Sequence, residues 1–154
     1  DKQNIPDGKK ALEPLHENDL QQFDHYTSSE IEKFVIRSAD SQKYIEDDEH
    51  FNSNSIINYL DELVLHQKTF KPHIPHHTGF GLSLLKGKSA HIHSYELDSS
   101  EAFLCLDGKW EITCDDQKVV IGPRDTFSAP KNSIRSLKQI SDQEGSLFLI
   151  RQKN

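Results

Sequence analysis

Short apolar runs separated by turn residues fill the second half of the 154-residue chain, and they constrain its fold more than any other feature. The runs are a few residues long, and glycine, proline, aspartate and asparagine are frequent between them. The runs cover residues 80–85, 91–93, 102–106, 110–114, 119–121, 126–129, 134–137 and 147–150. Closely spaced turns between short strands are typical of an all-β barrel or sandwich. We therefore predict a mainly β domain, a barrel or a sandwich, with its strands after residue 78.

The first half of the chain has a different pattern. Residues 1–35 are predicted to be an N-terminal extension or linker that is partly helical, and residues 36–154 to be the folded domain. One short helical segment is expected at residues 18–23. A second begins at Ser28, where a serine or threonine cap and the early acid Glu30 precede apolar residues at helical spacing.

Residues 53–66 carry five apolar side chains at the spacing of one helix face. They are Ile56, Ile57, Leu60, Leu63 and Val64. Apolar residues at i, i+3, i+4, i+7 and i+8 are typical of an amphipathic helix. A helix is therefore expected immediately before the loop at residues 68–78.

The composition of the chain excludes some classes of binding partner. The net charge is −7 and no basic patch is visible, which argues against a nucleic-acid partner. No apolar run is long enough to span a bilayer and no signal peptide is visible, so no membrane partner is expected. The two cysteines, Cys105 and Cys114, do not make a disulfide framework, which favours a reduced, cytoplasmic setting. Because the chain starts at Asp1 and contains no methionine, we expect a trimmed chain or part of a longer polypeptide.

The chemistry centres on His91-Ile92-His93 and the glutamate that follows. Side chains alternate along a strand, so His91 and His93 point the same way and both imidazoles can reach one ion. Glu101 opens the next apolar run, which Asp107 and Gly108 end in a tight turn. Two histidines and one carboxylate on neighbouring strands form the facial triad that suits iron(II). The alternative is an ordinary strand that happens to carry two histidines.

These residues also follow a known motif, in which a glycine, a His-X-His pair, a glutamate, six residues and a glycine succeed one another. Here the motif is represented by Gly87, His91, His93, Glu101 and Gly108. Asp125 and Pro130 stand at the separation of the second motif. Residues 79–151 thus resemble a cupin barrel, similar to small single-barrel, RmlC-like cupins, some of them quercetin-dioxygenase-like. The resemblance implies a single cupin barrel, also called a double-stranded β-helix or jelly roll, behind a partly helical N-terminal extension.

The sequence departs from the cupin pattern at its fourth metal ligand. Arg135 stands there, and an arginine cannot bind a metal because it stays protonated and only donates hydrogen bonds. Strand alternation places Ile134 and Arg135 on opposite faces, so one of them must face the interior. In one interpretation Arg135 grips an anionic group of a ligand by a bidentate pair. In the other it forms an internal ion pair with Glu101 or Asp107, or leans out from the rim.

Neighbouring residues offer alternatives to this set. Glu96 competes with Glu101 as the carboxylate, although it lies in a seven-residue segment, 94–100, that is expected to be solvated. His76 or His77, before the first barrel strand, could replace a missing ligand at the barrel mouth. Cys105 shares the strand phase of Glu101 and is expected to be a small buried hydrophobe.

Three functions from different classes are possible for such a chain. The favoured one is a metal-dependent cupin enzyme that acts on a small anionic organic molecule, and the resemblance implies a dioxygenase-like reaction. His91, His93 and Glu101 would hold iron(II) or manganese(II), with zinc or nickel as alternatives, and Arg135 would bind the substrate's acid group. The alternative is a non-catalytic ligand-binding or sensor cupin with a degenerate metal site, and a third is an interaction module of a longer chain. A homodimer is expected from base rates and from the need to cover barrel edges.

Overall fold

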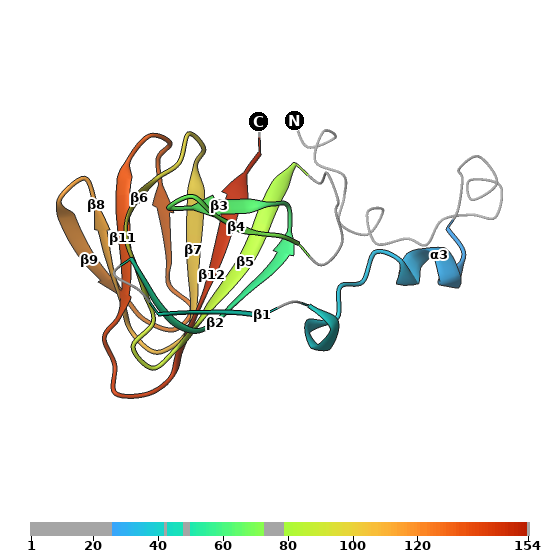
Figure 1. Ribbon diagram of the computed structural model, residues 1–154, viewed down its shortest axis with the longest axis horizontal. Helices are drawn as coiled ribbons and strands as arrows, with labels where there is room; N and C mark the ends of the chain where they lie inside the picture. The colour runs from blue at the N-terminus through green and yellow to red at the C-terminus, as the bar shows by residue number, and fades with distance from the viewer. Residues whose placement is uncertain (1–25, 42, 48–49, 73–78, 154) are drawn as a thin grey trace, which may run out of the picture. The chain divides into compact units, whose positions relative to one another are not determined.

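The computed structural model describes residues 26–41, 43–47, 50–72 and 79–153 (Figure 1). The chain divides into two units, residues 1–35 and residues 36–154. No helix among the described residues is long and apolar enough to cross a membrane.

In the first unit, helix α3 covers Ser28–Glu32 and begins at the N-cap Thr27. The Thr27 hydroxyl accepts a 3.3 Å hydrogen bond from the Glu30 backbone N–H, and the Glu30 carboxylate accepts one of 2.6 Å from the Thr27 backbone N–H. This reciprocal pair is a capping box, which satisfies backbone donors at the start of the helix. The helix predicted at Ser28 is thus confirmed, whereas the one expected at residues 18–23 lies outside the described residues.

The second unit consists of antiparallel strands after a short 3-10 helix, η1 (Ser38–Asp40). A ten-stranded sheet has the order β10-β7-β12-β5-β2-β6-β11-β8-β9, with β1 paired to β2, and β3 and β4 form a separate hairpin. The strands are β1 (Lys43–Asp47), β2 (Phe51–Leu60), β3 (Leu63–Leu65), β4 (Lys68–Phe70), β5 (Phe80–Gly87), β6 (His91–Glu96), β7 (Glu101–Asp107), β8 (Trp110–Cys114), β9 (Gln117–Ile121), β10 (Thr126–Ala129), β11 (Ile134–Gln139) and β12 (Gly145–Gln152). The predicted mainly β jelly-roll architecture is confirmed.

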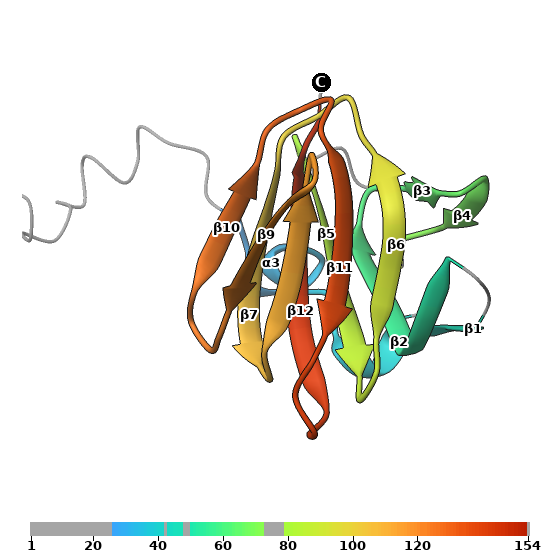
Figure 2. The ribbon, with the colours of Figure 1, turned by 90° about the vertical axis from the view of Figure 1, so that its left-hand side faces the viewer.

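The sheet folds over so that two groups of strands face each other, with β6, β8, β9 and β11 on one side and β2, β5, β7 and β12 on the other (Figures 1 and 2). Strand β2 joins the groups through only two residue pairs with β6. In β5, β7 and β8 alternate residues are buried in the space between the two groups. In β7, Glu101, Phe103 and Cys105 are at most 1% exposed, which confirms the predicted interior position of Cys105.

The helix expected at residues 53–66 is wrong, because these residues form part of β2 and then strand β3. Leu63 is 2% exposed and the adjacent Val64 is 48% exposed, which is the alternation of a strand. Between the strands Asp61 adopts a φ of 58°, a turn conformation incompatible with a continuous helix. The sheet therefore begins at Lys43 in β1, well before residue 79 where the barrel core was expected.

Candidate functional site

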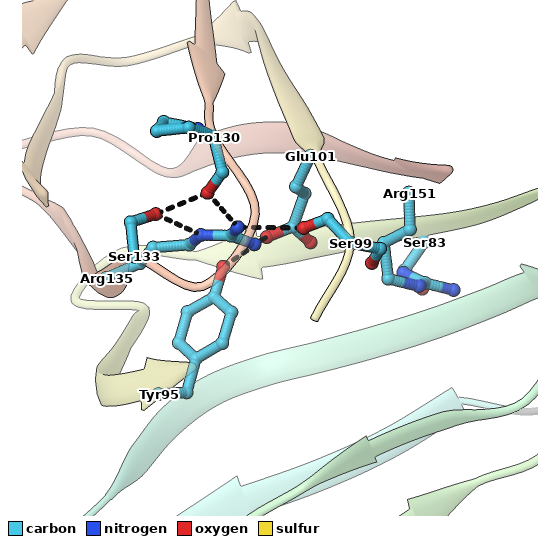
Figure 3. A network of polar contacts seen from close by, with 8 residues as sticks. All are labelled: Ser83, Tyr95, Ser99, Glu101, Pro130, Ser133, Arg135 and Arg151. Atoms are coloured by element: carbon cyan, nitrogen blue, oxygen red, sulfur yellow. Dashed lines mark hydrogen bonds and ion pairs between the residues drawn. The ribbon is translucent and has the colours of Figure 1, made fainter. Parts of the chain in front are cut away.

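A buried ion pair occupies the interior of the barrel (Figure 3). Glu101, at the start of β7, lies 3.0 Å through its Oε1 from Nη1 of Arg135 on β11, and neither side chain is exposed. The Tyr95 hydroxyl, from β6, donates a 2.8 Å hydrogen bond to the same Oε1. Because Ile134 is 53% exposed and Arg135 is fully buried, Arg135 is the residue of the two that faces inward. Of the two interpretations of Arg135, the structure has the internal ion pair.

The other donors of Arg135 are also engaged. Its Nε donates to the Ser133 hydroxyl at 3.0 Å, and its Nη2 donates to the carbonyl oxygens of Ser99 at 2.8 Å and Pro130 at 2.6 Å. The guanidinium thereby ties the loop before β7 to the loop before β11. With its fork occupied by protein groups, Arg135 presents no bidentate edge to a ligand. Arg135 therefore has a structural role in this barrel.

The structure does not bring His91 and His93 together with Glu101. Ile92 and Tyr95 take the inward positions of β6 at 1% and 5% exposure, whereas His91 is half-buried and His93 is exposed. The two imidazoles do share a face, as predicted, but it is the outer face, where they line a groove of about 500 Å³. Among the described residues, no three His, Cys, Asp or Glu side chains gather where they could hold a metal ion. The residues present therefore do not fit the expected triad.

The alternative metal ligands do not complete a metal-binding triad either. Glu96 is exposed at the end of β6, as expected for a solvated residue. His76 and His77 lie outside the described residues.

Arg151 is a second buried arginine, and the sequence analysis missed it. It is 3% exposed near the end of β12. Its Nη1 donates to the Ser83 hydroxyl at 2.9 Å, and its Nη2 donates longer bonds to Asn58 Oδ1 at 3.5 Å and the Leu60 carbonyl at 3.4 Å. Its Nε has no hydrogen-bond partner, and no carboxylate of the described residues lies within ion-pair distance. The phase of β12 could have revealed it, since Arg151 follows the buried Leu147 and Leu149 at a period of two.

Burial dominates the electrostatics of this interior. It raises the pKa of Glu101, against the lowering effect of the Tyr95 hydrogen bond and of both arginines. Burial and the Glu101 charge raise the pKa of Tyr95 well above its usual value, so that Tyr95 remains a neutral donor. Burial also lowers the pKa of Arg151. In the part of the chain that the structure describes, the carboxylate oxygen Glu101 Oε2 has no hydrogen-bond partner, and neither does Nε of Arg151.

Comparison with solved structures identifies the architecture. The second unit's fold is similar to the Schizosaccharomyces pombe Cnp3 cupin domain, with a TM-score of 0.50 and 16% identity over 68% of each chain. An RmlC-like cupin from Shewanella frigidimarina gives a TM-score of 0.55 and 10% identity over 79% of this chain and 91% of that one. AerE from Microcystis aeruginosa gives a TM-score of 0.52 and 15% identity, over 74% of this chain and 46% of that one. No protein-family model and no curated protein sequence matches the chain.

These similarities show that the chain has the cupin fold, as the sequence predicted. At 10% to 16% identity they extend to the fold alone. The resemblance to quercetin-dioxygenase-like cupins is not confirmed.

Proposed function

We propose that this protein is a non-catalytic cupin that binds a small anionic molecule at Arg151. The observation that carries the proposal is a buried guanidinium that has no carboxylate partner among the described residues and one unpartnered N–H. Burying a charge without a partner is costly, and an anion that binds there would offset the cost. The proposal keeps the anionic ligand expected from the sequence but moves its binding residue from Arg135 to Arg151.

Two hollows at this end of the barrel offer space for such a ligand. One, of about 260 Å³, is lined by Ser100, Glu101 and Arg151 among others. The other, of about 280 Å³, lies beside the β3–β4 hairpin and also includes Arg151 in its lining. Both are slightly smaller than the roughly 300–1,000 Å³ of drug-sized ligand pockets, which favours a molecule of few atoms.

The geometry supports this function better than a metal-dependent, dioxygenase-like enzyme. A metal site in the barrel would need inward-facing ligands around Glu101. Instead the Glu101 Oε1 accepts hydrogen bonds from Tyr95 and Arg135, and the two histidines line the outer groove. A guanidinium beside the carboxylate also repels a divalent cation.

The test is an Arg151→Met variant titrated with inorganic phosphate, acetate and glycolate. We expect the unmodified protein to bind at least one of these anions and the variant to lose about 2–5 kcal/mol of its binding free energy, the scale for truncating one side of a buried charge pair. Isothermal titration calorimetry measures both. Arg124→Met is the matched control, because Arg124 is exposed in the turn before β10 and its removal changes the net charge equally. Equal affinity in the Arg151→Met protein, or no binding of any of the three anions, would refute the proposal.

A further inference from the structure

We infer that the bound anion is a small hydroxy acid, whose carboxylate accepts from Arg151 and whose hydroxyl donates to Glu101. This inference rests on the proposed function and names its ligand class. It starts from two buried polar atoms that have no hydrogen-bond partner among the described residues, Nε of Arg151 and Oε2 of Glu101. Both side chains are more than nine-tenths buried, so neither atom can be satisfied by bulk water.

The two oxygens of Glu101 have different surroundings. Oε1 accepts from the Tyr95 hydroxyl at 2.8 Å and from Nη1 of Arg135 at 3.0 Å, whereas Oε2 accepts from no group among the described residues. An ionised carboxylate can only accept hydrogen bonds, so the ligand atom that faces Oε2 must be a donor. A plain carboxylate would instead bring only acceptor oxygens against Oε2.

The Nε–H of Arg151 requires the opposite group, an acceptor. The rest of this guanidinium is held by Ser83 and Asn58, so Nε has a fixed position. Gly81 makes the position available, because a Cβ there would lie 2.5 Å from Nη2 of Arg151. Arg151 is thus anchored by β2 and β5, and it leaves one donor for a ligand oxygen.

Glu101 and Arg151 lie in the same region of the barrel. The charges of Glu101 and Arg151 influence each other's pKa, and Figure 3 shows Arg151 on the side of Glu101 away from Arg135. Glu101 and Arg151 also line the same hollow of about 260 Å³. A molecule with an anionic acceptor and an adjacent hydroxyl donor satisfies both atoms at once, and a 2-hydroxycarboxylate carries these two groups on neighbouring carbon atoms.

The experiment compares two pairs of acids that differ only in the hydroxyl group: glycolate with acetate, and lactate with propionate. Calorimetric titration at pH 8 and constant ionic strength gives each dissociation constant. We expect each hydroxy acid to bind roughly 10- to 100-fold more tightly than its partner, the effect of leaving a buried acceptor unsatisfied. Acetate that binds as tightly as glycolate, with Arg151→Met still abolishing both, would overturn the hydroxy-acid inference and leave the anion site intact. Failure of all four acids to bind would instead overturn the anion site itself.

Glu101→Gln supplies the second readout. Its carbonyl oxygen can still accept from Tyr95 and Arg135, which directs the amide N–H₂ toward the ligand in place of Oε2. The preference for glycolate over acetate is then expected to disappear or reverse. An unchanged preference would mean that Glu101 does not read the hydroxyl. Should this variant not fold, the comparison of the four acids on the unmodified protein decides the question alone.

Discussion

Replacing Arg135 with methionine is expected to destabilise the protein by about 3–5 kcal/mol, the usual cost of removing one partner of a buried ion pair. The substitution leaves Glu101 as an uncompensated buried carboxylate and deprives the carbonyl oxygens of Ser99 and Pro130 of their donor. Equilibrium unfolding in urea, followed by Trp110 fluorescence, measures the loss. Lys138→Met is the matched control, because Lys138 lies exposed on the same strand, and it should change stability by no more than about 0.5 kcal/mol.

The loss of stability caused by Arg135→Met should also depend on pH. Burial raises the pKa of Glu101, so the native state binds more protons than the unfolded state as this carboxyl titrates. Stability in the Arg135→Met protein is therefore expected to fall as the pH rises above the ordinary glutamate pKa of about 4.3, and the penalty should shrink as the pH is lowered toward it. Adding Glu101→Gln to Arg135→Met should remove this slope. A penalty below about 1 kcal/mol at neutral pH would contradict a structural role for the pair.

Replacing Phe51 with alanine is the second large perturbation, with an expected cost of about 3–5 kcal/mol for a fully buried phenylalanine. Phe51 is 0% exposed at the start of β2, and its ring contacts Phe70 and His66 of the β3–β4 hairpin at centroid distances of 5.8 and 5.6 Å. Lys68 also places its Nζ 5.6 Å from the ring centroid. The side chain therefore joins the hairpin to the barrel, and its removal leaves a cavity between them.

Val64→Ala is the control for the hairpin itself, because Val64 points outward from β3 and should cost no more than about 0.5 kcal/mol. Urea unfolding of both variants provides the comparison. Similar small losses for the two would mean that the region before residue 79 adds little to the core.

The strand phases were predictable where each strand alternates without interruption. On β7 the position of Glu101 fixed those of Phe103 and Cys105, and on β11 the alternation restricted the inward residue to Ile134 or Arg135. The partner of Arg135 lies 34 residues earlier in the chain, so its identity depends on which strands face each other across the barrel. The sequence could therefore suggest an ion pair of Arg135 with Glu101 or Asp107, but it could not decide between that pair and a ligand-binding role for Arg135.

The direction of the histidines could not be derived in the same way. Alternation shows that His91 and His93 share a face but does not say which face is inside. The apolar Ile92 between them takes the interior position. The pairing of β6 with β11 then shifts register between Arg135 and Leu137 of β11, and Ser94 of β6 adopts a φ of 52°. Resemblance to a metal-binding motif suggested the inward direction, whereas the apolar residue between the histidines favoured the outward one.

The error at residues 53–66 has a different cause. In β2 the consecutive Ile56, Ile57 and Asn58 are all at most 4% exposed, which removes the simple alternation that would mark a strand. The Asn58 amide is buried because it donates to the carbonyl oxygens of Asp61 and Phe70 at 2.7 Å, contacts made only after the hairpin has folded. Neither effect can be read from a short stretch of sequence. The helical spacing of the remaining apolar residues arose from the end of β2 and the three-residue strand β3, which a turn joins.

The central claim is that Arg135, and not a metal ion, is the cationic partner of Glu101 inside this cupin barrel. The elemental content of the protein, purified without chelator or added metal, tests it most directly. We predict far less than one equivalent of iron, manganese, zinc or nickel per chain, with no change in the Glu101→Gln variant. One equivalent of metal per chain that is lost on Glu101→Gln, or on the joint replacement of His91 and His93 by alanine, would contradict the account.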